Sequence, residues 1–99
     1  YMHNVFGAYK VTYFNACREY CEKMGGDWRK VHTGMLLSRY INDTHTYVPG
    51  PDGKFGYGGK CFPKDVNAFA KMTKGTSLGV LLEHLHELNV HFRGFEEKI

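Results

Sequence analysis

The sequence predicts an all-α domain, and three observations lead to that expectation. Apolar side chains recur at helical spacing from Asn4 to about Met24, and again after Pro63 and after Ser77. Glycines stand where each of these periodic stretches stops. The alternation of apolar and polar residues that marks a half-buried strand does not persist anywhere in the sequence.

Length and composition limit the class of protein. Ninety-nine residues make one small domain, whose core is modest and gains from oligomerisation. Apolar residues make up 42% of the chain, which indicates a globular protein. The formal net charge of +3 is too small for the basic patch of a nucleic-acid-binding protein, so we expect no nucleic-acid partner.

The cysteines, histidines and apolar runs restrict the compartment and the cofactors. The three cysteines match neither a disulfide framework nor a zinc site, so we expect reduced thiols and a cytoplasmic location. The six histidines lack the i, i+4 spacing that would direct two rings at one ion, so we expect no metal. No apolar run approaches the roughly 20 residues of a spanning helix, so we expect no membrane association.

The first predicted helix runs from Asn4 to about Met24 and stops at Gly25-Gly26. Its polar side consists of Thr12, Asn15, Arg18, Glu19, Glu22 and Lys23. Its apolar arc covers nearly half of the helical wheel and consists of Phe6, Tyr9, Tyr13, Phe14, Ala16, Cys17, Tyr20, Cys21 and Met24. This arc is wider than one small domain needs, so we expect a homodimer through this helix. Lys10 lies inside the arc, where we expect a buried stem and an ammonium group at the edge.

A short helix and a long loop are expected next. Asp27 caps a helix from Trp28 to about Thr33, Gly34 ends it, and residues 35–41 form a further helical turn. Residues 42–59 are rich in turn signals and form a loop. A loop of this length in a compact domain is usually functional or mobile, so we interpret it as a loop that covers substrate. The alternative is a tolerated surface insertion.

Two more helices complete the expected fold. One runs from near Pro63 to about Thr73, and Ser77 caps the other. The last helix carries an apolar seam with alternating spacings of three and four, which core packing explains without a ligand: Leu78, Leu81, Leu85, Leu88 and Phe92. Gly94 ends this helix, and residues 95–99 form a charged tail.

The stretch most indicative of chemistry is GYGGKCFPKD, residues 56–65. Three of its first four residues are glycine, so its backbone can adopt positive φ and approach a ligand closely. Pro63 suits the first turn of a helix, which places Cys61 at or just before a helix N-terminus. The helix dipole, Lys60 and Lys64 all favour a thiolate there. We therefore interpret Cys61 as a reactive cysteine; a buried structural thiol is the alternative.

This stretch resembles the active-site motif of the UDP-glucose/GDP-mannose dehydrogenase family, in which the cysteine is the nucleophile. The resemblance is nearest to the UDP-glucose 6-dehydrogenases, because the Lys64-Asp65 pair is often replaced in enzymes that oxidise N-acetylated sugars. It covers residues 1–99 and implies the central, dimer-forming domain of such an enzyme. The implied fold is all-α with a long first helix, like the C-terminal domain of 6-phosphogluconate dehydrogenase.

The resemblance also implies roles for particular residues. Cys61, Asp65 and Asn4 would be catalytic, and Lys64 would contact the cofactor. The substrate-binding residues would be Tyr57, Gly58, Gly59, Phe62 and Arg39. Arg39 aligns with an arginine that reaches the substrate of the neighbouring subunit, although the residues on both sides of it depart from the family's pattern. The family's site lysine would fall immediately before Tyr1.

The implied reaction is a four-electron oxidation of a sugar's primary alcohol to a carboxylate, with NAD as the hydride acceptor and UDP-glucose as the expected nucleotide sugar. The Cys61 thiolate would attack the aldehyde, and oxidation of that adduct would give a thioester that water hydrolyses. Asp65 would orient a water or the family's lysine, while Asn4 would help to hold the oxyanion. The alternative for Asp65 is an acid that only complements the helix dipole.

Family enzymes are several-fold longer, with an NAD-binding Rossmann domain before this region and a nucleotide-binding one after it. The sequence contains no dinucleotide-binding fingerprint, so we expect the chain to be the middle domain of such an enzyme. Two other classes stay open. One is a non-catalytic helical dimerisation module with a relic site. The other is a free-standing thiol-dependent protein, which is disfavoured because no resolving cysteine follows Cys61.

Overall fold

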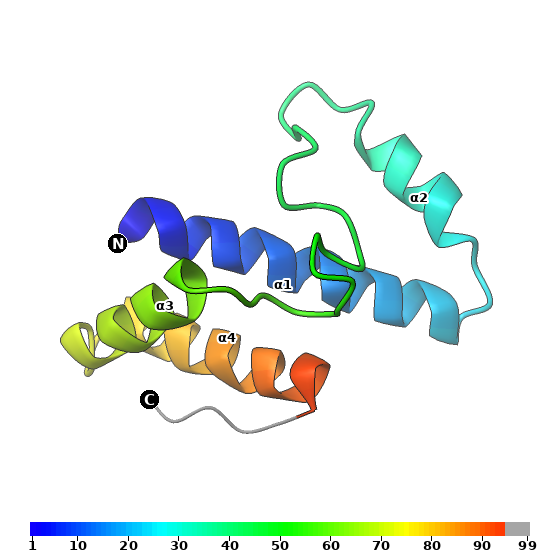
Figure 1. Ribbon diagram of the computed structural model, residues 1–99. Helices are drawn as coiled ribbons and strands as arrows, with labels where there is room; N and C mark the ends of the chain where they lie inside the picture. Colours follow the sequence, from blue (N-terminus) through cyan, green and yellow to red (C-terminus); the bar gives the residue numbers. More distant parts are fainter. Residues whose placement is uncertain (95–99) are drawn as a thin grey trace.

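The structure is a computed structural model that describes residues 1–94, and these residues form four helices and no strand (Figure 1). The helices are α1 (Met2–Lys23), α2 (Trp28–Met35), α3 (Cys61–Met72) and α4 (Ser77–Arg93). The expectation of an all-α fold with a long first helix is confirmed. The charged tail expected over residues 95–99 lies outside the described residues.

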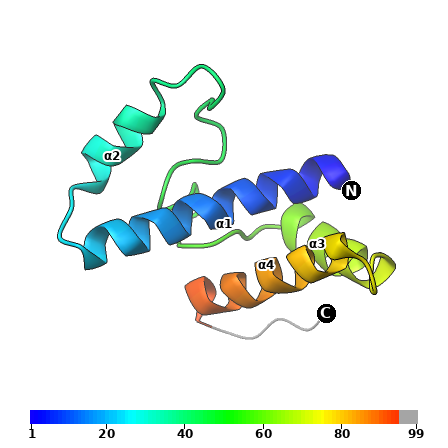
Figure 2. The ribbon, with the colours of Figure 1, turned by 180° about the vertical axis from the view of Figure 1, so that it is seen from behind.

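Helix α1 is the spine of the domain. Helices α3 and α4 pack against each other and along one side of α1, while α2 lies on the other side, over its C-terminal half. Seen from behind, the loop between α2 and α3 crosses α1 to reach the start of α3 (Figure 2). None of the helices in the described part of the chain has the length and hydrophobicity to cross a membrane.

Two apolar clusters hold these elements together. The larger joins α1, α3 and α4 through Val5, Ala8, Tyr57, Val66, Phe69, Ala70, Leu82 and Leu85. The smaller joins α1 to α2 and the returning loop through Phe14, Trp28 and Val48, with Cys17, Cys21, Met35, Ile41 and Phe55 partly buried around it. Because α1 contributes to both clusters, burial of its two sides orients every other helix.

The inward side of α1 differs from the predicted arc. Thr12 and Asn15 were expected on the solvent side, but both are buried together with Val5 and Ala8. The Thr12 hydroxyl donates to the Ala8 carbonyl at 2.9 Å, and Asn15 Nδ2 donates to the Val11 carbonyl at 2.8 Å. The prediction for Thr12 and Asn15 was wrong, because backbone carbonyls of α1 satisfy these side chains and their small size lets neighbouring segments approach.

Most large apolar residues of α1 remain outside the two clusters. They lie three, four or seven positions apart and form what we call the aromatic stripe: Met2, Phe6, Tyr9, Tyr13, Tyr20 and Met24. Each of these side chains is exposed in the single chain. Lys10 Nζ donates to the carbonyl and to Oδ1 of Asn42, both at 2.9 Å, so its ammonium group lies at the helix edge and also holds the loop.

Helix α2 and the turn after it depart from the prediction. The helix continues through Gly34 to Met35, so the expected stop at Gly34 is wrong. A helical glycine costs about 1 kcal/mol, and Met35 offsets that cost by packing into the smaller apolar cluster. Residues 36–40 form turns and bends instead of the expected helical turn. The predicted stops at Gly25 and Gly94 are confirmed, with φ angles of 75° and 73°.

The starts of α3 and α4 are also shifted. Helix α3 begins at Cys61, two residues before Pro63, and its N-cap residue Lys60 makes no side-chain capping bond. Proline fits inside the first turn because the N–H it lacks has no partner there. The cap of α4 is Thr76 instead of Ser77, since the Thr76 hydroxyl accepts a hydrogen bond from the Gly79 N–H at 3.1 Å.

The predicted seam of α4 is wrong at two positions. Leu81 and Leu88 are 43% and 42% exposed, whereas Leu82 is fully buried and Leu85 is 3% exposed. The inward side also includes Asn89, which is 2% exposed. A hydrophobicity pattern counts an asparagine as a surface residue, so it placed the seam one residue away from the true inward side.

Replacement of Leu82 by alanine tests this corrected packing. Leu82→Ala should lower the free energy of unfolding by about 2–5 kcal/mol, because it leaves a cavity in the larger cluster. Leu81→Ala removes the same atoms from a half-exposed site and should cost about 1 kcal/mol or less. Chemical denaturation of the two variants and the unmodified chain measures both values, and equal losses would contradict the observed orientation of α4.

Candidate functional site

Cys61 is the first residue of α3, and its side chain is exposed. The amide groups of the first helical turn therefore point toward its surroundings, where they favour a negative charge. Cys17 and Cys21 are half-buried on α1, and all three cysteines are free. The structure thus presents the predicted nucleophile at a helix N-terminus and leaves it accessible.

Asn4 and Asp65, the two other residues expected to be catalytic, are brought together. Asn4 Nδ2 donates a hydrogen bond of 2.8 Å to Asp65 Oδ2, between residues 61 positions apart. Asp65 lies one helical turn after Cys61 and is buried. The Lys64 ammonium is 4.0 Å from Asp65 Oδ1, and its side chain is 74% exposed. The start of α1 therefore meets the start of α3 beside Cys61.

A pocket of about 710 Å³ lies between the glycine-rich segment and the loop that precedes it. Four of the predicted substrate-binding residues line it: Tyr57, Gly58, Gly59 and Phe62. The opposite wall comes from residues 43–52 of the loop, where His45 makes an edge contact with the Phe62 ring at 5.1 Å between centroids. The interpretation that this loop covers substrate stays a prediction.

The loop is fastened to the helices at four points. Its anchored residues and their partners are Asn42 with Lys10, Thr46 with His32, Val48 with Arg18, and Asp52 with Arg93. The Thr46 hydroxyl donates to the Asp43 carbonyl, so His32 must donate through Nε2 to the Thr46 oxygen. Burial lowers the pKa of His32, while the nearby Asp43 charge opposes that shift; the neutral imidazole fits this donor role.

Five predicted site residues do not line the pocket. Four of them lie at the starts of α1 and α3: Asn4, Cys61, Lys64 and Asp65. The fifth, Arg39, is exposed in the turn after α2. Its expected contact with a neighbouring subunit's substrate stays a prediction. In the described part of the chain, no three histidine, cysteine, aspartate or glutamate side chains gather as a metal site requires.

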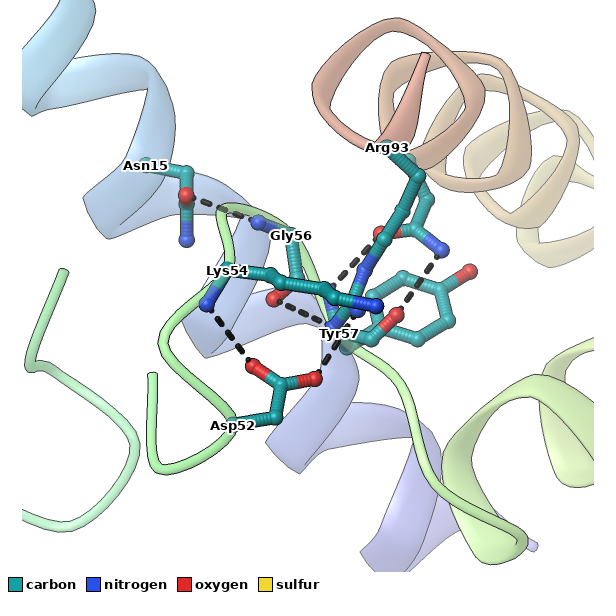
Figure 3. A network of polar contacts seen from close by, with 7 residues as sticks. Asn15, Asp52, Lys54, Gly56, Tyr57 and Arg93 are labelled. Carbon is teal, nitrogen blue, oxygen red and sulfur yellow. Dashed lines mark hydrogen bonds and ion pairs between the residues drawn. The ribbon is translucent and has the colours of Figure 1, made fainter. Parts of the chain in front are cut away.

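Two buried asparagines hold the glycine-rich segment, and sequence reasoning missed both. Figure 3 shows one of them, Asn15, beside Gly56. Asn15 Oδ1 accepts from the Gly56 N–H at 2.8 Å. Asn89 Oδ1 accepts from the Tyr57 N–H at 2.8 Å, and Asn89 Nδ2 donates to the Tyr57 carbonyl at 3.1 Å. For Asn15, the available signal was its register with Val5, Ala8 and Thr12, because that side of α1 carries no charge over residues 5–15.

Two glycines of the motif are needed for different reasons. Gly56 has a φ of 76°, and a Cβ there would lie 2.5 Å from Asn89 Oδ1. Gly58 does not have a positive φ, but a Cβ there would lie 2.6 Å from Arg93 Nη2. The expectation of positive φ therefore holds for Gly56 and not for Gly58, where close approach of an arginine is the constraint.

The chain is similar to known proteins over most of its length. Residues 1–91 match the model of the UDP-glucose/GDP-mannose dehydrogenase family, central domain. The chain is 39% identical over 71 residues to the UDP-glucose 6-dehydrogenase of Rhizobium meliloti (strain 1021), covering 72% of this chain and 15% of that protein. It is 32% identical over 90 residues to UDP-glucose 6-dehydrogenase TuaD of Bacillus subtilis (strain 168), covering 90% of this chain and 18% of that protein.

The chain therefore spans less than a fifth of the length of these curated relatives. No solved structure matches it significantly.

Alkylation tests the accessibility and helix-start position of Cys61. Iodoacetamide should modify Cys61 at least about tenfold faster than Cys17 or Cys21, because Cys61 is exposed at a helix N-terminus. Mass spectrometry of peptides from timed samples gives the three rates. The denatured chain is the control, in which the rates should converge. Equal rates in the folded chain would contradict the assignment of Cys61 as the reactive thiol.

Proposed function

The chain belongs to the UDP-glucose/GDP-mannose dehydrogenase family as its central domain, and from this premise we propose that it serves an NAD-dependent UDP-glucose 6-dehydrogenase. In this role it supplies the nucleophile Cys61 and the dimer interface of an enzyme that converts UDP-glucose to UDP-glucuronate. The observation that carries the proposal is the convergence of Asn4 and Asp65 beside the exposed Cys61.

The proposed chemistry assigns a separate task to each of these groups. The C6 alcohol of the sugar first loses a hydride and its hydroxyl proton, which gives an aldehyde. The Cys61 thiolate adds to this aldehyde, and loss of a second hydride from the resulting thiohemiacetal leaves a thioester. Attack by water on the thioester carbonyl releases the carboxylate and restores the thiol. Nucleophilic attack near neutral pH requires thiolate character, which the α3 N-terminus supports.

Asn4 and Asp65 act on two oxygen atoms of the reaction, that of the attacked carbonyl and that of the hydrolytic water. Asn4 Nδ2 carries two hydrogens, and one of them is donated to Asp65. The second hydrogen is available to stabilise the oxyanion that forms when the aldehyde or thioester is attacked. Asp65, oriented by Asn4, accepts a proton from the water that hydrolyses the thioester.

Few residues of this chain are suited to hold NAD. The described residues form no strand, so they do not build a dinucleotide-binding α/β unit. Lys64 is the residue that we assign to the cofactor, because it lies three residues after Cys61 and its exposed ammonium group can face an anionic pyrophosphate. When bound, NAD supplies the hydride acceptor for both oxidation steps.

A chimera tests the proposed function. Residues 1–91 replace the aligned segment of the Rhizobium meliloti enzyme, and NADH and UDP-glucuronate are then measured with UDP-glucose as substrate. We expect two NADH per sugar. Cys61→Ala should abolish UDP-glucuronate formation because no thioester can form, whereas the control Cys17→Ala should keep it. Full conversion by Cys61→Ala would refute the nucleophile assignment, and turnover by the isolated chain would refute the domain assignment.

The aromatic stripe supports the dimer part of the proposal. Its members run from Met2 at the start of α1 to its C-cap residue Met24, on the side that neither apolar cluster covers. Tyr13 is near the middle of the stripe and is 52% exposed. A two-fold interface centred there would bury each residue of the stripe twice. The same stripe also supports the second candidate, a dimerisation module without activity. The chimera distinguishes the two, because only an enzyme domain gives UDP-glucuronate formation that Cys61→Ala abolishes.

A charge in the stripe should prevent this dimer. Tyr13→Glu should reduce the sedimentation mass from that of a dimer to that of a monomer, because the glutamate would be buried twice in an apolar interface. Val80→Glu is the matched control, since Val80 is 54% exposed on α4, away from the stripe. A monomeric unmodified chain at micromolar concentration, or equal effects of the two variants, would refute an α1 interface.

A further inference from the structure

Arg93, in the last turn of α4, has no role in the proposed chemistry, although its environment is unusual for an arginine. Its side chain is only 7% exposed, and it lines the pocket beside Cys61. Its Nε is buried and has no acceptor among the described residues. A buried guanidinium is costly unless its remaining N–H groups are well paired, so the contacts of its Nη atoms determine whether this arrangement is stable.

The Nη atoms connect the two walls of the pocket. Nη1 donates to Asp52 Oδ2 at 2.9 Å, and Asp52 belongs to the loop wall. Nη2 donates to the Gly56 carbonyl at 3.2 Å, in the glycine-rich wall (Figure 3). The guanidinium also fills the space that a Cβ on Gly58 would need. A planar, forked group can bridge two such acceptors, whereas an ammonium group cannot hold the same geometry.

Asp52 in turn organises the loop wall. Its Oδ1 accepts from the Lys54 N–H at 3.0 Å, and the Gly50 N–H donates to the Lys54 carbonyl at 3.0 Å, which closes a tight turn. The hydrogen bond from Arg93 holds the pKa of Asp52 below its usual value, so the carboxylate stays charged at neutral pH. The carboxylate thus holds its own turn with one oxygen and Arg93 with the other.

We propose that Arg93 is a positioning residue for the cysteine site, which holds the turn at residues 50–54 and the segment Gly56–Gly58 in register as opposite walls of the pocket. Arg93 does not act on the reacting atoms. It sets the spacing of the walls that bind the sugar and holds the backbone at Gly56 and Tyr57. The effect of Arg93 on substrate binding rests on the proposed function, whereas its effect on the order of the backbone at Gly56 and Tyr57 does not.

Amide hydrogen exchange in this chain tests the clamp directly. Arg93→Met should accelerate exchange at Gly56 and Tyr57 by at least about tenfold more than at the core amides of Val66 and Leu82. Asp52→Asn should produce a smaller acceleration at the same two amides. Arg29→Met is the control, because Arg29 is exposed on α2, and it should leave both amides unchanged.

Other outcomes of this measurement would overturn the proposal. Equal acceleration at Gly56, Tyr57, Val66 and Leu82 would mean that Arg93 only stabilises the whole domain. Unchanged exchange would mean that the two asparagines suffice without it. Arg93→Lys should restore protection only in part, because one ammonium group cannot span both acceptors. Full restoration by lysine would overturn the bridging role.

The chimera gives the functional half of the test. There, Arg93→Met should raise the KM for UDP-glucose about tenfold while kcat changes by less than about threefold, because the pocket walls are displaced and Cys61 is not. A fall in kcat with an unchanged KM would overturn the positioning of the pocket. If the chimera does not oxidise UDP-glucose at all, the proposed function fails, and hydrogen exchange still decides the role of Arg93.

Discussion

The backbone of Gly56 and Tyr57 passes between α1 and α4 without belonging to any helix, so its buried polar groups need partners from elsewhere. Asn15 and Asn89 supply them, one from each flanking helix. An asparagine side chain carries both a donor and an acceptor, so Asn89 can pair with both the N–H and the carbonyl of Tyr57, as a neighbouring strand would. Because α3 begins a few residues later at Cys61, these bonds fix the backbone segment that leads toward this helix.

The same requirement explains the composition of α1. Apart from Phe14, its buried residues are small or short, because the loop and the other helices approach closely there. Its other large aromatic residues are therefore displaced to the outside, where they form most of the aromatic stripe. A single helix thus combines a polar, closely packed side that supports the site with an apolar side that is suited to a partner.

The long loop behaves as a wall of the pocket and not as a loose connection. Side chains from α1, α2 and α4 each bond to it, so its position follows from the packing of the helices. The pocket beside Cys61 exists because this wall faces the glycine-rich segment. The spacing between the two walls is set where Arg93 contacts both.

The sequence by itself determined the all-α class, the long first helix, the glycine stops at Gly25 and Gly94, and the place of Cys61 at a helix start. These features depend on local propensities and on spacing along the chain, which a single sequence displays directly. The family was also recognisable, because ten successive residues carry its motif.

Only the tertiary structure decided which sides of α1 and α4 are buried, since a buried asparagine and a surface asparagine look alike in a hydrophobicity pattern. The roles of Asn15, Asn89 and Arg93, and the bond from Asn4 to Asp65, join residues that are at least 32 positions apart. No local pattern contains such pairs, because each arises when helices pack and leave a polar group that only a distant side chain can reach.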